Sequence, residues 1–137
     1  MAENTSLRTK STLGLTWIKD AFIGGSEIID YRVNVAIADG SYSILASGVV
    51  ASSYLAIDLT SGLVYNFKIE SRNEYGYSTY SSSISLLCAY VPDPPVTVTT
   101  ANSANQVTIT WSSPVTNGSP ITAFKIFIRQ KDGTTYT

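Results

Sequence analysis

The sequence contains no histidine, and it has one cysteine, Cys88, among 137 residues. Without histidine, the usual general acid–base groups, Cys–His nucleophiles and common zinc ligand sets cannot be assembled. We therefore expect no enzymatic activity, no metal or cofactor site and no small-molecule substrate. A single cysteine also excludes a disulfide within the chain, so a packed core must hold the fold together.

Charge is scarce as well, with nine basic and ten acidic residues and a net charge of −1. No positive stripe is available to follow a phosphate backbone, so a nucleic-acid partner is not expected. No apolar run reaches the roughly 18 residues that span a bilayer. The start, Met1 to Ser6, lacks the basic and apolar regions of a secretion signal. It fits either an intracellular protein or a piece of an exported one.

What the sequence does contain is apolar alternation with a period of two, which places alternate side chains on one face of a strand. The clearest strand lies between Tyr65 and Ser71, and a helical apolar stripe is absent. Asp39-Gly40 predicts a two-residue hairpin turn. Seven strands in two sheets indicate an all-β Greek-key sandwich. The expected strands lie near Leu7 and over about 12–17, 28–37, 42–45, 53–57, 65–71 and 78–88.

The same pattern begins a second time. Trp17 and Trp111 end matching strands and lie 94 residues apart, from 17 to 111, which is the length of one small sandwich domain. We therefore expect a tandem array, with a first domain over 1–91, a Pro-rich linker over 92–95 and an incomplete second copy over 96–137. That remainder has room only for strands A to C or C′.

Several motifs identify the kind of sandwich. They are the strand ending at Trp17, the Gly24-Gly25 turn, Leu59 six residues before Tyr65, and the run Tyr65-x-Phe67-x-Ile69-x-Ser71-x-Asn73-x-x-Gly76. On these residues the first repeat resembles a fibronectin type III domain, an immunoglobulin-like sandwich of seven strands. The resemblance covers about 7–90, and a partial one covers 94–136.

This resemblance implies structural roles for particular aromatic residues. It places Trp17 at the centre of the core, and it places Tyr65 at the E–F corner, hydrogen-bonded back to the chain. With the corresponding residues of the second copy, the expected structural core is Trp17, Tyr31, Leu59, Tyr65, Phe67, Trp111 and Phe124.

The unfinished second copy leaves two hypotheses open. Its half-sandwich cannot cover Trp111, Phe124, Ile126 and Ile128. Either the copy is completed by further residues of a longer protein, or its missing strands come from another molecule by strand addition. The second hypothesis would join copies of the chain head to tail in an extracellular filament.

Candidate interaction and modification sites follow from residue type. Tyr75, Tyr77 and Tyr80 form a possible interaction loop, since tyrosine suits recognition surfaces, although they equally suit covering the sandwich edge. Asn4 and Asn117 fit the glycosylation acceptor pattern. Lys131-Asp132-Gly133 predicts a structural turn, and Cys88 a small buried apolar residue.

These features together indicate a non-catalytic structural or interaction module, in keeping with cell adhesion, from a multidomain cell-surface or secreted protein. Its expected partner is a protein of a kind that the sequence does not specify, or another copy of itself. A filament subunit and an accessory domain of a larger secreted enzyme are the alternatives.

Overall fold

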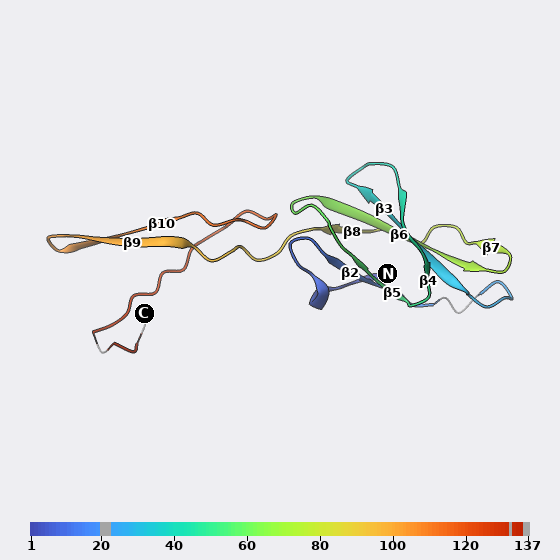
Figure 1. Ribbon diagram of the computed structural model, residues 1–137, viewed down its shortest axis with the longest axis horizontal. Coiled ribbons are helices and arrows are strands. Elements are labelled where there is room, and N and C mark those ends of the chain that lie inside the picture. Colours follow the sequence, from blue (N-terminus) through green and yellow to red (C-terminus); the bar gives the residue numbers. More distant parts are fainter. Residues whose placement is uncertain (20–22, 132, 136–137) are drawn as a thin grey trace.

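The computed structural model describes residues 1–19, 23–131 and 133–135 (Figure 1). In this part of the chain, the one helical element is a short 3₁₀ turn, η1 (Thr5–Leu7), and no helix is long and apolar enough to cross a membrane. The strands are β1 (Ala2–Asn4), β2 (Leu13–Thr16), β3 (Asp30–Ile37), β4 (Ser43–Val49), β5 (Ser53–Ala56), β6 (Val64–Asn73), β7 (Gly76–Tyr77), β8 (Ile84–Leu87), β9 (Val96–Ser103) and β10 (Gln106–Ser112).

Strands β1 to β8 form two antiparallel sheets. One has the order β1-β2-β5, and the other has the order β4-β3-β6-β7 with β8 also paired to β6. If β7 and β8 are taken as two pieces of one last strand, this is a seven-stranded sandwich. The all-β sandwich predicted from the alternation is confirmed.

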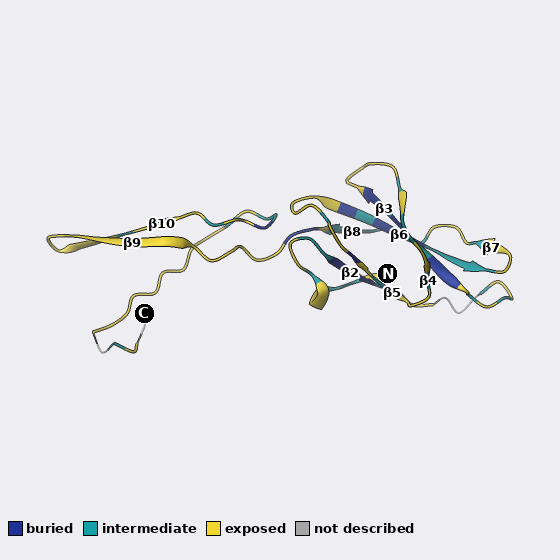
Figure 2. Ribbon diagram, viewed as in Figure 1, coloured by how far each residue is buried: buried dark blue, intermediate teal, exposed yellow. Residues whose placement is uncertain are grey.

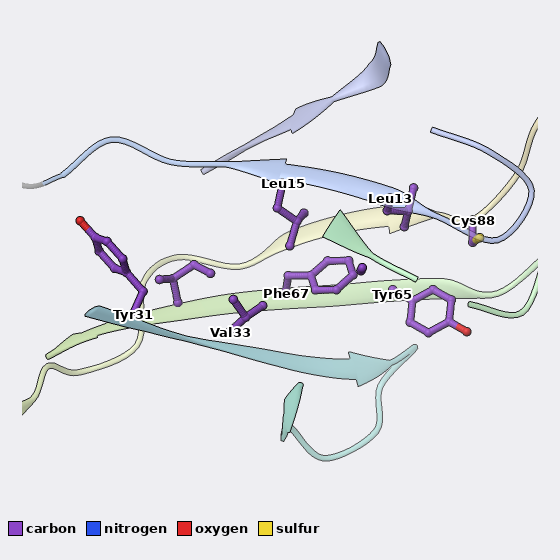
Figure 3. Packing of buried hydrophobic residues seen from close by; sticks show 9 residues of the cluster. Leu13, Leu15, Tyr31, Val33, Tyr65, Phe67 and Cys88 are labelled. Atoms are coloured by element: carbon purple, nitrogen blue, oxygen red, sulfur yellow. The ribbon is translucent and has the colours of Figure 1, made fainter. Parts of the chain in front are cut away.

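The core lies between these two sheets. Leu13 and Leu15 of β2 point toward Val33 of β3 and Phe67 of β6 (Figure 3). Along β6 the side chains of Tyr65, Phe67 and Ile69 are buried, whereas their neighbours in the strand are partly exposed. The period of two in the sequence thus reports a sheet with one face on the core and one face outward.

The E–F corner, between β5 and β6, has the contact that the resemblance implies. The Tyr65 hydroxyl accepts a hydrogen bond from the Thr60 backbone N–H at 2.9 Å. The Leu59 backbone N–H donates to the Ser11 carbonyl at 3.0 Å, and the Leu59 side chain packs against the core from its periphery. Hydrogen bonds therefore hold the corner both to the Tyr65 side chain and to the segment that precedes β2.

Trp17 departs from its expected place at the core centre. Strand β2 ends at Thr16, and the partly buried Trp17 ring lies edge-on to Tyr31 with centroids 5.3 Å apart. Tyr31 sits at one end of the core, and fully buried Phe67 occupies its middle (Figure 3). The Trp17 indole N–H is buried and has no hydrogen-bond partner within the described residues.

Two further expectations near the strand ends were wrong. The first strand is β1, and Leu7 instead lies in η1, where it packs so closely over Gly14 that a Cβ there would lie 2.9 Å from the Leu7 Cβ. The hairpin after β3 turns around Ala38-Asp39 rather than Asp39-Gly40, and the Gly40 N–H donates to the Ile37 carbonyl. Strand β3 stays paired with β6 as far as Ile37, so the turn begins directly after it, at Ala38.

The last strand is interrupted where the sequence predicted a continuous one over 78–88. Between β7 and β8, the hydroxyls of Ser78 and Ser81 accept hydrogen bonds from the backbone N–H groups of Ser71 and Ile69, both at 3.0 Å. The two serine hydroxyls thus accept hydrogen bonds from β6 N–H groups that would donate to backbone carbonyls in a regular ladder. Side chains that bond to neighbouring backbone in this way compete with regular pairing.

The second copy consists of the antiparallel hairpin β9–β10 followed by an extended segment. Every residue of β9 is exposed (Figure 2), and residues 121–128 form no ladder with the other described residues. Strand β8 ends at Leu87 and β9 begins at Val96, so the expected linker over 92–95 lies between them. The exact boundaries of the two copies stay a prediction.

Trp111 and Phe124 pack on each other, with centroids 5.3 Å apart, but they are not core residues in this chain. Phe124 is 43% exposed. The reason is that, in the described part of the chain, no second sheet lies over them. An apolar groove of about 450 Å³ remains, lined in part by Val98, Ile109 and Ile126.

Candidate interaction surface

The outward face of β3 and β6 carries aromatic and cationic side chains. Arg32 of β3 lies opposite Glu70 of β6 in the register, and Lys68 is the next outward residue of β6. Tyrosines from the neighbouring segments lie over them. We call the set the tyrosine face; it comprises Arg32, Tyr42, Lys68, Glu70, Tyr77 and Tyr80.

At one end of the tyrosine face, the Arg32 guanidinium lies over an aromatic ring. Its Cζ is 3.5 Å from the Tyr77 ring centroid, and its Nη1 is 3.5 Å from Glu70 Oε2. The same carboxylate oxygen accepts a hydrogen bond from Asn34 Nδ2 at 3.0 Å. Because stacking and ion pairing act together, Arg32 and Tyr77 are held in one arrangement.

At the other end, Lys68 lies between two tyrosines. Its Nζ is 4.4 Å from the Tyr42 ring centroid and 5.3 Å from that of Tyr80. The Tyr42 hydroxyl is 2.8 Å from Ser83 Oγ. None of the ion pairs in the described ranges includes Lys68, so its ammonium group is held by attraction to the negative faces of the two rings rather than by a carboxylate.

The predicted loop of Tyr75, Tyr77 and Tyr80 does not form one cluster. Tyr77 is beneath Arg32, Tyr80 is beside Lys68, and Tyr75 projects from the turn between β6 and β7 with 84% of its surface exposed. This turn is shaped by Asn73, whose Oδ1 accepts from the Tyr75 N–H at 2.9 Å, and by Gly76 at φ 133°. The structure thus offers one free ring and two rings fixed by cations.

A bidentate ion pair joins the strands beside this surface. Arg72 Nε donates to Asp30 Oδ1 at 2.9 Å, and Arg72 Nη2 donates to Asp30 Oδ2. The guanidinium hydrogen bonds lower the pKa of the Asp30 carboxyl and raise that of Arg72. The two residues of this pair lie 42 positions apart in the sequence, and no local motif links them. The pairing register of β3 with β6 is the signal that would have found the pair.

Acid should weaken this connection. Because the folded state lowers the pKa of Asp30, the unfolded chain binds its proton more readily, and stability falls as protons are added. The contribution is complete above the ordinary carboxyl pKa of about 3.9 and is lost as the pH falls through the lowered folded-state value. We expect the thermal midpoint to drop less steeply below about pH 4 in Asp30→Asn than in the wild type. Parallel acid slopes would contradict this assignment.

The two glycosylation candidates have different surroundings. Asn4 is partly exposed and caps η1, its Oδ1 accepting from the Ser6 N–H at 3.3 Å. Asn117 is only 5% exposed, and its Nδ2 donates to the Val91 carbonyl at 2.9 Å and to Asp93 Oδ1 at 2.8 Å. The nitrogen of Asn117 that a glycan would modify is therefore buried and hydrogen-bonded in this fold, whereas that of Asn4 lies near the surface.

Cys88 and the predicted turn near the end of the chain both have structural rather than chemical roles. Cys88 is fully buried, its thiol donates to the Lys10 carbonyl at 3.3 Å, and burial raises its pKa. Near the end of the chain, the Gly133 N–H donates to the Gln130 carbonyl at 3.0 Å, as a turn requires; Asp132 lies outside the described residues. Across the described ranges, no group of three or more acidic or cysteine side chains is placed to hold a metal ion.

No protein-family model matches the sequence. A Kelch domain-containing protein of Saccharolobus solfataricus is 37% identical over 67 residues, which are 49% of this chain and 9% of that protein. The chain thus spans less than a tenth of the length of this curated relative. Because the match covers so small a share of this relative, the activity of the whole protein can only be proposed.

Solved structures match the sandwich more broadly. A titin module from human cardiac muscle is 25% identical, with a TM-score of 0.54 over 59% of this chain and 82% of the module. The twitchin kinase region from C. elegans is 25% identical, with a TM-score of 0.56 over 59% of this chain and 14% of that one.

A two-domain segment of chicken tenascin matches further along the chain. It is 18% identical, with a TM-score of 0.54 over 78% of this chain and 58% of that one. The matched fibronectin type III domains are of a generally non-enzymatic kind, typical of multidomain proteins. Together with the sheet order of β1 to β8 and the Tyr65 corner, these neighbours identify this chain as one with the fibronectin type III fold.

Proposed function

We propose that the chain is a non-catalytic interaction and spacing module of a larger cell-surface or secreted protein, and that its tyrosine face binds a protein partner. The small share of the Kelch domain-containing relative that it matches supports a position within a much longer chain. The titin and tenascin neighbours support a structural or interaction role. The observation that carries the proposal is the half-exposed Tyr80 beside Lys68, together with the exposed Tyr75 in the turn that leads to Tyr77.

The chemistry of this surface favours a protein over other partners. Tyrosine and arginine carry much of the binding energy in protein interfaces, because they bury a large area and still offer hydrogen bonds. Arg32 and Lys68 are already fixed against rings, so less side-chain entropy is lost on binding. Tyr75 is 84% exposed and Tyr80 51%, which leaves both rings free to be covered by a partner.

Photo-cross-linking from the tyrosine face and from the turn between β6 and β7 tests this proposal. A photoreactive phenylalanine analogue replaces Tyr75 or Tyr80 in the full chain, and Leu55, which is 41% exposed on the other sheet, is the matched control position. Mixed with surface proteins of the source organism, the first two should cross-link one common protein that the control does not. Excess wild-type chain should remove the product, and excess Arg32→Ala/Lys68→Ala chain should not. Equal products from all three positions, or none, would refute the proposal.

The apolar face of the second copy favours a second candidate, a filament subunit completed by strands of another molecule. Phe124, Ile126 and Phe127 are each about half exposed and line the groove over β9 and β10. Apolar surface of this kind marks association sites. Sedimentation at two concentrations separates the candidates, because strand exchange requires a mass that rises with concentration. A strict monomer would exclude it.

A further inference from the structure

The two copies meet through a pair of tight turns. One is Ser61-Gly62 at the E–F corner of the first copy, and the other is Asn117-Gly118, which follows β10 (Figure 1). A Cβ at Gly118 would lie 2.5 Å from the Gly62 nitrogen, 2.5 Å from Ser61 Oγ and 2.8 Å from the Cys88 carbonyl oxygen. Since real Cβ atoms do not approach so closely, only glycine allows this contact between the turns.

Residues 90–93, at the end of the first copy and the start of the linker, are hydrogen-bonded to the segment 115–117. The Tyr90 N–H donates to the Asn117 carbonyl at 2.9 Å, and the Asp93 N–H donates to the Val115 carbonyl at 3.0 Å. The buried Asn117 amide adds its hydrogen bonds to the Val91 carbonyl and to Asp93 Oδ1. Four hydrogen bonds therefore join residues 90–93 to the second copy.

Arg8 holds the other side of the junction. Its Nη1 donates to the Leu87 carbonyl at 2.8 Å and to the Ala89 carbonyl at 3.2 Å, where the chain leaves β8. Its Nε and Nη2 donate to the two carboxylate oxygens of Glu3 at 2.7 and 2.9 Å. The segment after β8, which leads into the linker, is thus anchored to the first strand of the first copy by charge-assisted hydrogen bonds.

The first copy provides an internal comparison for Gly118. Gly24-Gly25 is the corresponding turn, and Gly25 has φ 82°, close to the φ 92° of Gly118. A Cβ at Gly25 would meet nothing within 4 Å, however, whereas one at Gly118 meets the first copy. Both turns therefore need a residue that tolerates a positive φ. Only at Gly118 would a side chain also collide with the first copy.

From these contacts we infer that the Asn117-Gly118 turn docks on the Ser61-Gly62 corner and holds the two copies at one fixed angle. The E–F corner is then a binding surface for the glycine turn of the following repeat, and the linker is not a free hinge. This inference extends the proposed spacing role, because a locked junction carries the tyrosine face at a constant orientation to the next repeat.

Distances between two spin labels test the lock in the full 137-residue chain. The labels are placed on cysteines at the exposed positions Ser47 and Thr116; Cys88 is fully buried and its raised thiol pKa slows its labelling. We expect one narrow distance distribution in the wild type and a clearly broader one in Gly118→Ala. Gly25→Ala is the matched control, with similar backbone strain and no contact, and should remain narrow.

If Gly118→Ala perturbs the second copy itself, a charge exchange between positions 117 and 93 provides an independent test of the lock. Asn117→Asp puts a carboxylate against the Asp93 carboxylate and should broaden the distribution. Adding Asp93→Asn restores an amide–carboxylate pair and should narrow it again. A broad wild-type distribution, or equal widths for Gly118→Ala and Gly25→Ala, would overturn the lock. Neither result affects cross-linking from Tyr75 and Tyr80, so a failure of the lock is distinguishable from a failure of the proposed function.

Discussion

Replacing Phe67 with alanine is expected to lower the free energy of unfolding of the first copy by about 3–5 kcal/mol. Phe67 is fully buried in the middle of the core, and its ring stacks on Tyr65 with centroids 6.4 Å apart. Leu13 and Leu15 face it from the opposite sheet (Figure 3). The truncation therefore removes contacts with both sheets and leaves a cavity that rigid strands cannot close. Urea denaturation followed by circular dichroism measures the loss.

Two other variants serve as comparisons for the loss of stability in Phe67→Ala. Tyr75→Ala removes a ring that is 84% exposed and should change the stability by no more than about 0.5 kcal/mol. Trp17→Ala, which the sequence alone would place among the most damaging changes at about 3–5 kcal/mol, should cost less than Phe67→Ala, because the indole is at the end of the core. A larger loss for Trp17→Ala would mean that the core is centred elsewhere.

Amide hydrogen exchange is expected to differ by at least about a thousandfold between the two copies of a monomeric chain. Amides of β3 and β6 are bonded in the middle of a sheet and should exchange only on global unfolding of the first copy. Strands β9 and β10 pair only with each other among the described residues, and all of β9 is exposed. Because an isolated hairpin is only marginally stable in water, its amides should open locally and exchange far faster than those of β3 and β6. Exchange followed by NMR resolves each strand.

The concentration dependence of that exchange distinguishes the ways in which the second copy can be completed. If strands from another molecule cover Trp111 and Phe124, protection of β9 and β10 should rise with concentration, and the protein should associate in parallel. A matched variant, Phe124→Ser/Ile126→Ser, should abolish this rise without affecting β3 and β6. Strong protection of β9 in a dilute monomer would contradict the open hairpin.

The parts of the fold that follow local rules could be predicted from sequence. Alternation of Tyr65, Phe67 and Ile69 with polar residues identified β6, because a strand with one buried face leaves that pattern. The corner contact of Tyr65 also followed from a local motif. The turn after β3 and the division of β7 from β8 could not be predicted, since competing hydrogen bonds to β6 decide both.

The candidate surface was only partly accessible from sequence. Tyr75, Tyr77 and Tyr80 were selected by residue type, which cannot report that Tyr77 lies beneath Arg32 and that Tyr80 lies beside Lys68. Those pairs depend on how the strands are aligned, which brings together residues as far apart in sequence as Arg32 and Tyr77. Asn117 shows the same limit, because its acceptor motif is local while its burial depends on the linker.

The amino-acid sequence by itself determined an all-β chain in which one sandwich pattern is completed and then begun again, because strand periodicity and corner motifs are local properties of the chain. Only the tertiary structure decided which side chains lie at the core centre, which tyrosines are free, and that Asn117 and Gly118 join the two copies. These are contacts between distant segments, and packing distances rather than residue types select them.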